Sequence, residues 1–118
     1  MSALAALEVD RRQGVPVVQV SGEIDASNAD ELRDAVLRTV SNQDRGLVVD
    51  LSETGYLDSS GIQLLFEAAE RLRARQLELR VVVPAESFVA DVLRVTRLEH
   101  RVGVDATLGD ALDALAAG

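Results

Sequence analysis

The sequence predicts an α/β fold, in which helices pack on a mixed, mostly parallel sheet that opens with a β-hairpin. Two observations predict it. Apolar β-branched runs alternate with segments of helical apolar spacing, in the order β-β-α-β-α-β-α-β-α. Two strand-like runs also stand next to each other at the start, on either side of Gln13-Gly14. With 118 residues and no visible repeat or linker, we treat 1–118 as a single domain.

The first third of the chain predicts the hairpin and one helix. Residues 7–12 and 15–20 are its two strands. Residues 21–28 are polar and contain glycine, so we expect a loop there. Ser27 or Asn28, at the end of that loop, can cap a helix. The buried face of this helix would consist of Leu32, Ala35, Val36, Thr39 and Val40.

The stretch 46–65 is the centre of the prediction. Residues 47–49 are apolar and β-branched and predict a buried strand, whereas the polar residues 50–56 predict a loop. Residues 58–61, Asp-Ser-Ser-Gly, then lead into a helix. Its buried face would consist of Ile62, Leu65, Phe66, Ala69 and Leu72. A helix N-terminus has unpaired amides and a partial positive charge, so this junction suits an anion.

The start of that helix has two possible caps. Ser60 and Gln63 fit a capping box, which would make Ser60 the N-cap and leave Ser59 one residue outside the helix. Asp58 can cap the helix instead. The same residues are also what an ordinary helix start contains, with no function attached.

The C-terminal part predicts two more strands and two more helices. Residues 77–83 form a strand that ends at Pro84, and residues 102–104 form a short edge strand. Thr107 with Asp110 resembles the capped start of the last helix. The apolar positions of the two helices are Phe88, Val89, Val92 and Leu93, and then Leu108, Ala111, Leu112 and Leu115.

Composition excludes several classes of partner. The formal net charge is −8, which argues against nucleic acid and anionic membranes, because both attract clustered basic charge. All 12 basic residues are arginine, and there is no cysteine for disulfides or thiolate metal sites. The N-terminus lacks the basic start of a signal peptide, and no apolar run spans a bilayer. We expect a cytoplasmic protein without cofactor or metal.

Other chemistries fit the residues poorly. A serine hydrolase would need a base, and the one histidine, His100, lies in a polar stretch that predicts a surface position. A phosphate-binding P-loop needs a lysine, which the chain lacks. A receiver domain would use an aspartate at a strand end, such as Asp50, but its partner acids and lysine are missing. We expect Asp50 to bind nearby amides instead.

Phosphorylation is the chemistry that remains. Loops 22–28 and 55–61 both follow predicted strands, so they can share one surface that carries Asp25, Asp58 and Ser59. A phosphoryl group on Ser59 would add about −1.5 to −2 charge at a helix N-terminus, where the helix tolerates it. Beside Asp58 it would repel an acidic or apolar partner surface, so it would switch binding and leave the fold unchanged.

These residues resemble a known family. Residues 48–52 (Val-Val-Asp-Leu-Ser) and 56–62 (Tyr-Leu-Asp-Ser-Ser-Gly-Ile) look like the signature of STAS domains, the fold shared by bacterial anti-sigma-factor antagonists and sulfate transporter tails. Residues 22–25 (Gly-Glu-Ile-Asp) resemble the family's second marker. The resemblance covers nearly the whole chain, and the two motifs in this order are specific.

The resemblance implies an anti-sigma-factor antagonist without catalytic activity. In that family the serine after the motif aspartate, here Ser59, is phosphorylated by the anti-sigma factor, which is a serine kinase. The unphosphorylated antagonist binds that kinase and frees the sigma factor, and a phosphatase restores binding. The corresponding partner-binding residues are Asp25, Asp58, Ser59, Ser60, Gly61 and Ile62. Alternatives are a ligand- or nucleotide-sensing STAS module and, more remotely, the serine hydrolase.

Two residues depart from the family's pattern. Relatives often have glycine where this chain has Gln63, near the partner surface, and often have Thr-Gly-Leu where residues 96–98 are Thr-Arg-Leu. The second departure adds the charge of Arg97 after the third helix. Both leave the fold intact and bear on the identity of the partner.

Overall fold

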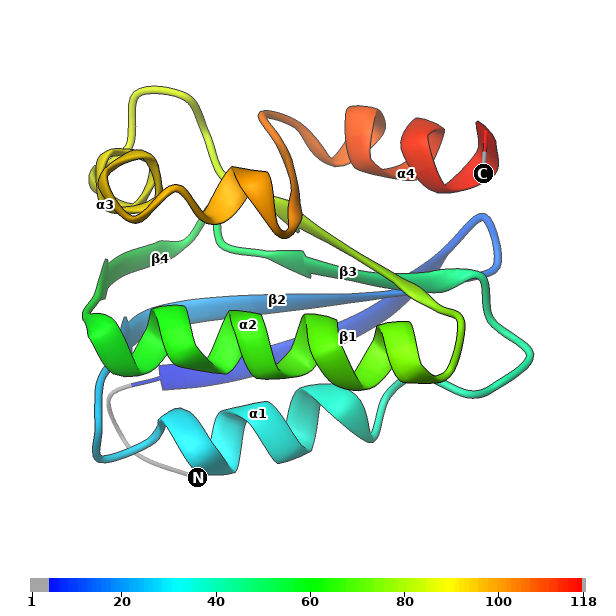
Figure 1. Ribbon diagram of the computed structural model, residues 1–118, viewed down its shortest axis with the longest axis horizontal. Coiled ribbons are helices and arrows are strands. Elements are labelled where there is room, and N and C mark those ends of the chain that lie inside the picture. Colours follow the sequence, from blue (N-terminus) through cyan, green and yellow to red (C-terminus); the bar gives the residue numbers. More distant parts are fainter. Residues whose placement is uncertain (1–4, 118) are drawn as a thin grey trace.

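A six-stranded sheet runs through the molecule, with helices on both of its faces (Figure 1). The structure is a computed structural model and describes residues 5–117. The strands are β1 (Ala5–Arg12), β2 (Val15–Ile24), β3 (Gly46–Asp50), β4 (Thr54–Leu57), β5 (Glu78–Val82) and β6 (Gly103–Asp105). The helices are α1 (Ala29–Leu37), α2 (Ser59–Ala74), α3 (Phe88–Thr96), the 3-10 turn η1 (Leu98–His100) and α4 (Leu108–Ala117).

The order of the strands confirms the predicted fold class. The sheet has the order β1-β2-β3-β5-β6, with β4 paired to β2 beyond the end of β3. Strands β1 and β2 are antiparallel, and the other described pairs are parallel. The hairpin turns through Gln13 and Gly14, whose φ angles of 55° and 77° give the left-handed backbone that a two-residue turn requires.

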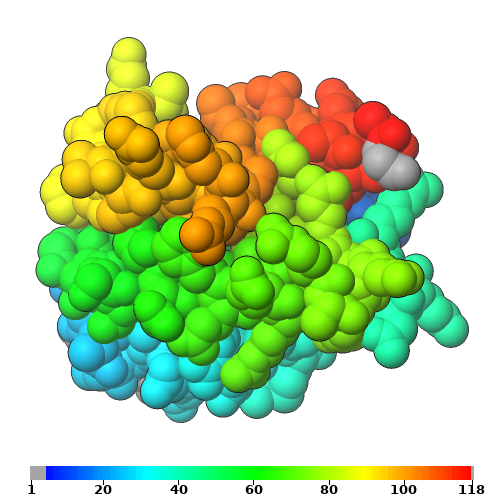
Figure 2. Space-filling model, in the orientation of Figure 1, coloured from blue at the N-terminus to red at the C-terminus, as the bar shows by residue number. Residues whose placement is uncertain are grey.

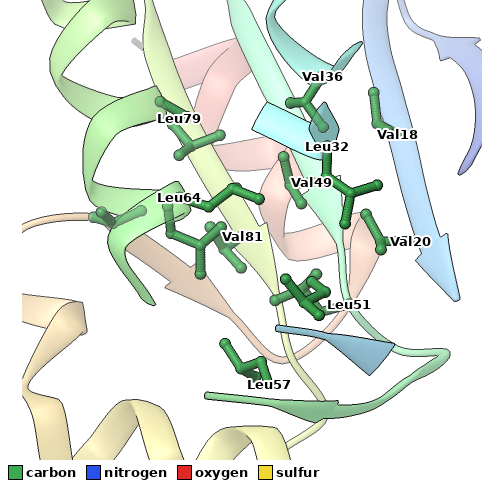
Figure 3. Packing of buried hydrophobic residues seen from close by; sticks show 14 of the residues in the cluster. Val18, Val20, Leu32, Val36, Val49, Leu51, Leu57, Leu64, Leu79 and Val81 are labelled. Atoms are coloured by element: carbon green, nitrogen blue, oxygen red, sulfur yellow. The ribbon is translucent and has the colours of Figure 1, made fainter. Parts of the chain in front are cut away.

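Residues on opposite faces of β2, β3 and β5 supply two separate cores. On β2, Val18 and Val20 belong to the core under α1 and α2, whereas Val15 and Val17 belong to the core under α4. Figure 3 shows the first core, where residues of the two helices lie over those of the strands; they include Leu32, Val36, Leu64, Val18, Val20, Val49 and Val81. The buried hydrophobic residues of the described chain are all Val, Leu, Ile or Ala.

Two predicted loops contain strand. Strand β2 continues to Ile24 through the first half of the predicted loop 21–28, and β4 occupies the end of the predicted loop 50–56. Their pairing creates both segments. Ile24 pairs with Leu57, and the Thr54 hydroxyl donates to the carbonyl oxygen of Val20 at 2.6 Å. Strand β4 has four residues, two of them exposed, and the sequence there has no alternation of polar and apolar residues that would predict a strand.

The other predicted elements are confirmed with small changes. Helix α1 ends at Leu37 and does not reach Val40, although the Val40 side chain is still buried. The Thr107 hydroxyl accepts the amide hydrogen of Asp110 at 3.1 Å, as the predicted cap of α4 requires. Asp50 accepts the amide hydrogen of Ser52 at 2.9 Å, the local role expected of it. Within the described residues, no helix has the length and apolarity needed to cross a membrane.

Candidate functional site

The structure brings the two predicted site loops together. Strands β2 and β4 are parallel neighbours, and the Asp58 amide donates to the carbonyl oxygen of Ile24 at 3.3 Å. Asp25 and Asp58 therefore begin adjacent loops at the same edge of the sheet. Ser59 follows directly, so the three residues share one surface, as the order of strands and helices predicted.

The cap of α2 is Asp58, not Ser60. The Asp58 side chain accepts the amide hydrogen of Ser60 at 2.8 Å, and α2 begins at Ser59. The predicted capping box of Ser60 and Gln63 is therefore wrong, because the carboxylate of Asp58, two residues before Ser60, already accepts the amide hydrogen at the helix start. Ser59 is the first helical residue and not a residue outside the helix.

The two serines differ in exposure. Ser59 is exposed at the helix N-terminus, whereas Ser60 is half-buried. Neither hydroxyl has a hydrogen-bond partner within residues 5–117. Ser59 thus offers a free hydroxyl to solvent at the positive end of a sixteen-residue helix.

Gly61 and Ile62 are buried and hold the helix start against the sheet. A methyl group on Gly61 would lie 2.9 Å from Leu57 Cβ and 3.3 Å from Ile24 Cγ2. Only glycine lets α2 approach the ends of β2 and β4 this closely. Both residues therefore help to fix the position of Ser59 at the start of the helix.

Asp25 shapes its own loop. Its carboxylate accepts hydrogen bonds from the amide and the hydroxyl of Ser27, at 2.9 and 2.5 Å. Asn28, only 1% exposed, accepts from the Asp25 amide at 3.0 Å and donates to the Glu23 carbonyl oxygen at 2.9 Å. From the sequence, Asn28 is expected only as one of two possible caps of α1. Its side chain forms no cap bond and instead locks this loop.

A cavity of about 390 Å³ separates α1 from the start of α2. Arg33 crosses it and donates to Glu67 at 2.7 Å, to Asp34 at 3.1 Å and to Asp30 at 3.2 Å. The bond to Asp34 and then the bond to Glu67 raise the pKa of the Arg33 guanidinium. The residues around this cavity are Ala26, Ala29, Asp30, Arg33, Ser59, Ser60, Gln63, Leu64 and Glu67. Arg33 could not be identified from the sequence, because no local pattern shows which residues of two separate helices form an ion pair.

An aromatic pair lies on the surface near the site. The rings of Tyr56 and Phe88 are stacked, with centroids 6.1 Å apart and planes inclined by 12°. They are 41% and 53% exposed, so Phe88 is not part of the buried face predicted for α3. Tyr56 comes from β4 and precedes Ser59 by three residues. Exposed stacked aromatics of this kind are typical anchors of protein interfaces.

The geometry gives no support to the serine hydrolase. His100 is exposed and lines a different cavity, with Arg97 and Arg101, away from the one that contains Ser59. No histidine or carboxylate hydrogen-bonds to either serine hydroxyl in the described chain. Across residues 5–117 there is also no group of three His, Asp or Glu side chains placed to hold a metal ion.

Known proteins with similar sequences have a common description. A family model for the STAS domain matches residues 6–111. Anti-sigma-F factor antagonist RsfB of Mycobacterium tuberculosis H37Rv is 30% identical over 105 residues, 89% of this chain and 84% of that protein. The putative anti-sigma factor antagonist BtrV of Bordetella bronchiseptica is 27% identical over 76% of this chain and 77% of its own length.

Solved structures agree with the sequence relatives. The crystal structure of an anti-sigma factor antagonist from Mycobacterium paratuberculosis has a TM-score of 0.83 and 32% identity, covering 95% of this chain and 94% of that one. Unphosphorylated SpoIIAA has a TM-score of 0.70 at 17% identity, over 96% and 100% of the two chains. The second likeness concerns the fold alone.

Proposed function

The chain belongs to the STAS domain family, and we propose that it is an anti-sigma-factor antagonist switched by phosphorylation of Ser59. Unphosphorylated, it binds an anti-sigma factor that is also a serine kinase, and the sigma factor is released. Phosphorylation of Ser59 ends this binding, and a phosphatase restores it. The names of the relatives with about 30% identity support the antagonist role.

The observation that carries the proposal is the free Ser59 hydroxyl. It is exposed, has no hydrogen-bond partner in the described chain, and follows directly after the Asp58 cap. A kinase can therefore reach the hydroxyl without unfolding the helix, because the bond that caps α2 comes from a different residue. The half-buried Ser60 is a poorer acceptor.

A phosphoryl group at Ser59 would change the charge of the surface much more than its shape. It adds about −1.5 to −2 charge. The amides at the start of α2 accommodate that charge, so the fold is kept. Asp30 and Glu67 already line the cavity beside Ser59, and Asp25 and Asp58 begin the adjacent loops. The additional charge therefore opposes any partner surface that is acidic or apolar.

The partner surface consists of Ser59, its two loops and the aromatic pair. Tyr56 and Phe88 supply exposed apolar area beside the switch. Asp25 keeps the neighbouring loop in shape through its bonds to Ser27. Gly61 and Ile62 act indirectly, by fixing the position of the helix start. In this proposal the protein works in the cytoplasm, with neither nucleic acid nor membrane as a partner.

The test is a binding and phosphorylation experiment with proteins of the source cell. Unphosphorylated protein is used for affinity capture, and the captured kinase is then incubated with ATP and each variant. We expect phosphate on Ser59 in wild type and in Ser60→Ala, and none on Ser59→Ala. Phosphate on Ser60, with Ser59→Ala still modified, would contradict the assignment. Calorimetry with ATP and GTP tests the nucleotide-sensing alternative, for which we expect nothing tighter than about millimolar.

A further inference from the structure

A second groove lies on the other side of α2 from Ser59. It has a volume of about 740 Å³ and separates the middle of α2 from the end of α3 and from η1. Figure 2 shows this face, with α2 between α1 on one side and the α3–η1 segment on the other. Arg71, Arg97 and Arg101 line the groove together with His100, and we call it the arginine groove.

The three arginines of the groove are unpaired. None of them forms an ion pair with a described carboxylate. The two glutamates that also line the groove, Glu67 and Glu70, pair with Arg33 at 2.7 Å and Arg73 at 3.6 Å. The groove therefore holds three arginines without a described carboxylate partner beside two glutamates that each have an arginine partner, on a chain of net charge −8. Such an arrangement is complementary to negative charge.

Arg101 has a side-chain contact in the groove, and Arg97 has an unusual backbone conformation beside it. The Arg101 guanidinium lies 5.8 Å from the centre of the Phe66 ring, within the range of a cation–π contact. Arg97 has φ 57° and ψ 33°, the left-handed backbone at the end of α3 that favours glycine. An arginine there carries a conformational cost and forms no ion pair with a described residue.

We propose that the arginine groove binds an acidic, extended segment of a protein partner. Its cations are spread over two elements, Arg71 on α2 and the others after α3, so they match carboxylates spaced along a peptide. A compact phosphate suits the site less well. Phosphate sites typically use a helix N-terminus, whereas this groove is bordered by the C-terminal end of α3.

The groove is continuous with the switch surface. Gln63 and Glu67 line both the cavity beside Ser59 and the arginine groove. A partner seated on Ser59 therefore has α2 beneath it and the three arginines on the far side of that helix. This part of the inference rests on the proposed function, and it makes the acidic segment part of the anti-sigma factor.

The first test needs no partner. A hexaglutamate peptide is titrated into ¹⁵N-labelled protein and followed by NMR. We expect amide shifts within residues 66–71 and 96–101, with a Kd of about a millimolar or tighter. The Arg97→Gly Arg101→Gln double variant should bind about tenfold more weakly, since each exposed ion pair contributes up to about fivefold. Arg38→Gln, an exposed arginine outside the groove, is the matched control and should bind as wild type does.

Two results would contradict the proposal that the groove binds an acidic segment. One is the absence of amide shifts within residues 66–71 and 96–101 when the peptide is present at about five times the expected millimolar Kd. The other is tighter binding there of ATP or of anionic lipid vesicles than of the peptide. Ser59→Asp should leave peptide affinity unchanged, so failure of the phosphorylation switch would not affect this result.

The second test uses the captured anti-sigma factor. We expect the double variant to bind it about tenfold more weakly than Arg38→Gln does, while Ser59 still accepts phosphate from the kinase. Equal binding of the two variants would show that the partner does not occupy the groove, whatever happens at Ser59.

Discussion

The Asp58 carboxylate accepts the amide hydrogen of Ser60 at 2.8 Å, and this bond fixes the point at which α2 begins. It makes Asp58 the cap of α2 and leaves the neighbouring Ser59 for the phosphorylation that we propose. The Asp58 carboxylate caps the helix. The hydroxyl of Ser59, which lies between Asp58 and Ser60, has no described hydrogen-bond partner. The same bond makes a prediction about stability.

Asp58→Ala should lower the free energy of unfolding by about 0.5–2 kcal/mol, the usual cost of losing an N-cap. Ser60→Ala should cost much less, because the Ser60 hydroxyl makes no described hydrogen bond. Urea unfolding of both variants measures the difference. A larger loss for Ser60→Ala would mean that the serine hydroxyl, not the carboxylate, satisfies the helix start.

Ser59→Ala should bind the partner constitutively, because it cannot accept phosphate. Ser59→Asp should weaken binding only in part, since one carboxylate carries less charge than a phosphate. Neither change should alter the circular dichroism spectrum, because a negative group at this terminus does not oppose the helix. Calorimetric titration of both variants against the partner checks the order of affinities.

Gly61→Ala should destabilise the protein by about 1–2 kcal/mol. The added methyl group would lie 2.9 Å from Leu57 Cβ, and such overpacking outweighs the gain in helix propensity. Gly55→Ala is the matched control, since its nearest atom would lie 4.0 Å away, at the Gly22 carbonyl oxygen. We expect Gly55→Ala to stay within about 0.5 kcal/mol of wild type. If both variants lost the same stability in thermal unfolding, the close packing of α2 against Leu57 would not be the reason for glycine at position 61.

Arg97→Gly and Gln76→Gly should each stabilise the protein by about 0.5–1 kcal/mol. Both residues end a helix in the left-handed region, with φ of 57° and 60°. At Gln76 the amide of Leu77 also donates to the Leu72 carbonyl oxygen at 2.8 Å, which completes the helix-ending motif. Thermal melts of the two single variants provide the check. A fall in midpoint for either one would show that its side chain contributes more than its backbone strain costs.

Asp44 should make stability depend on acid pH. Partial burial opposes ionisation, but hydrogen bonds from the Ser41 amide and the Arg11 guanidinium outweigh it and lower the pKa of Asp44. A lowered carboxylate pKa stabilises the fold above the unfolded value of 3.8, and this contribution is lost as pH falls through the folded value. The gap in urea midpoint between wild type and Asp44→Asn should therefore narrow as pH falls below about 5 and close once pH is below the folded pKa of Asp44. If the gap in urea midpoint did not change with pH, the ionisation of Asp44 would not be the source of the difference in stability.

The sequence predicted those parts of the fold that local pattern determines. The β-branched runs of β2, β3 and β5 and the apolar spacing of the helices lie where expected, and the alternation of strands and helices placed Asp25 beside Asp58. The motif that resembled STAS domains was matched by a family model over residues 6–111.

What the sequence could not predict depends on contacts between distant segments. Strand β4 exists because Thr54 to Leu57 pair with the end of β2, which no local pattern encodes. The bond from Arg33 to Glu67 and the stack of Tyr56 on Phe88 each join residues more than thirty positions apart. The cap of α2 could not be chosen because Asp58 and Ser60 both have capping side chains, and only the backbone geometry distinguishes them.

The Tyr56–Phe88 stack also gives the chain an optical reporter of its own. Tyr56 is the one tyrosine, and there is no tryptophan, so the near-ultraviolet emission of the protein comes from a single ring three residues ahead of Ser59. That ring is partly open to solvent and partly covered by Phe88. Its intensity and anisotropy respond to changes around Ser59, so the proposed phosphorylation and docking can be timed in the unlabelled chain.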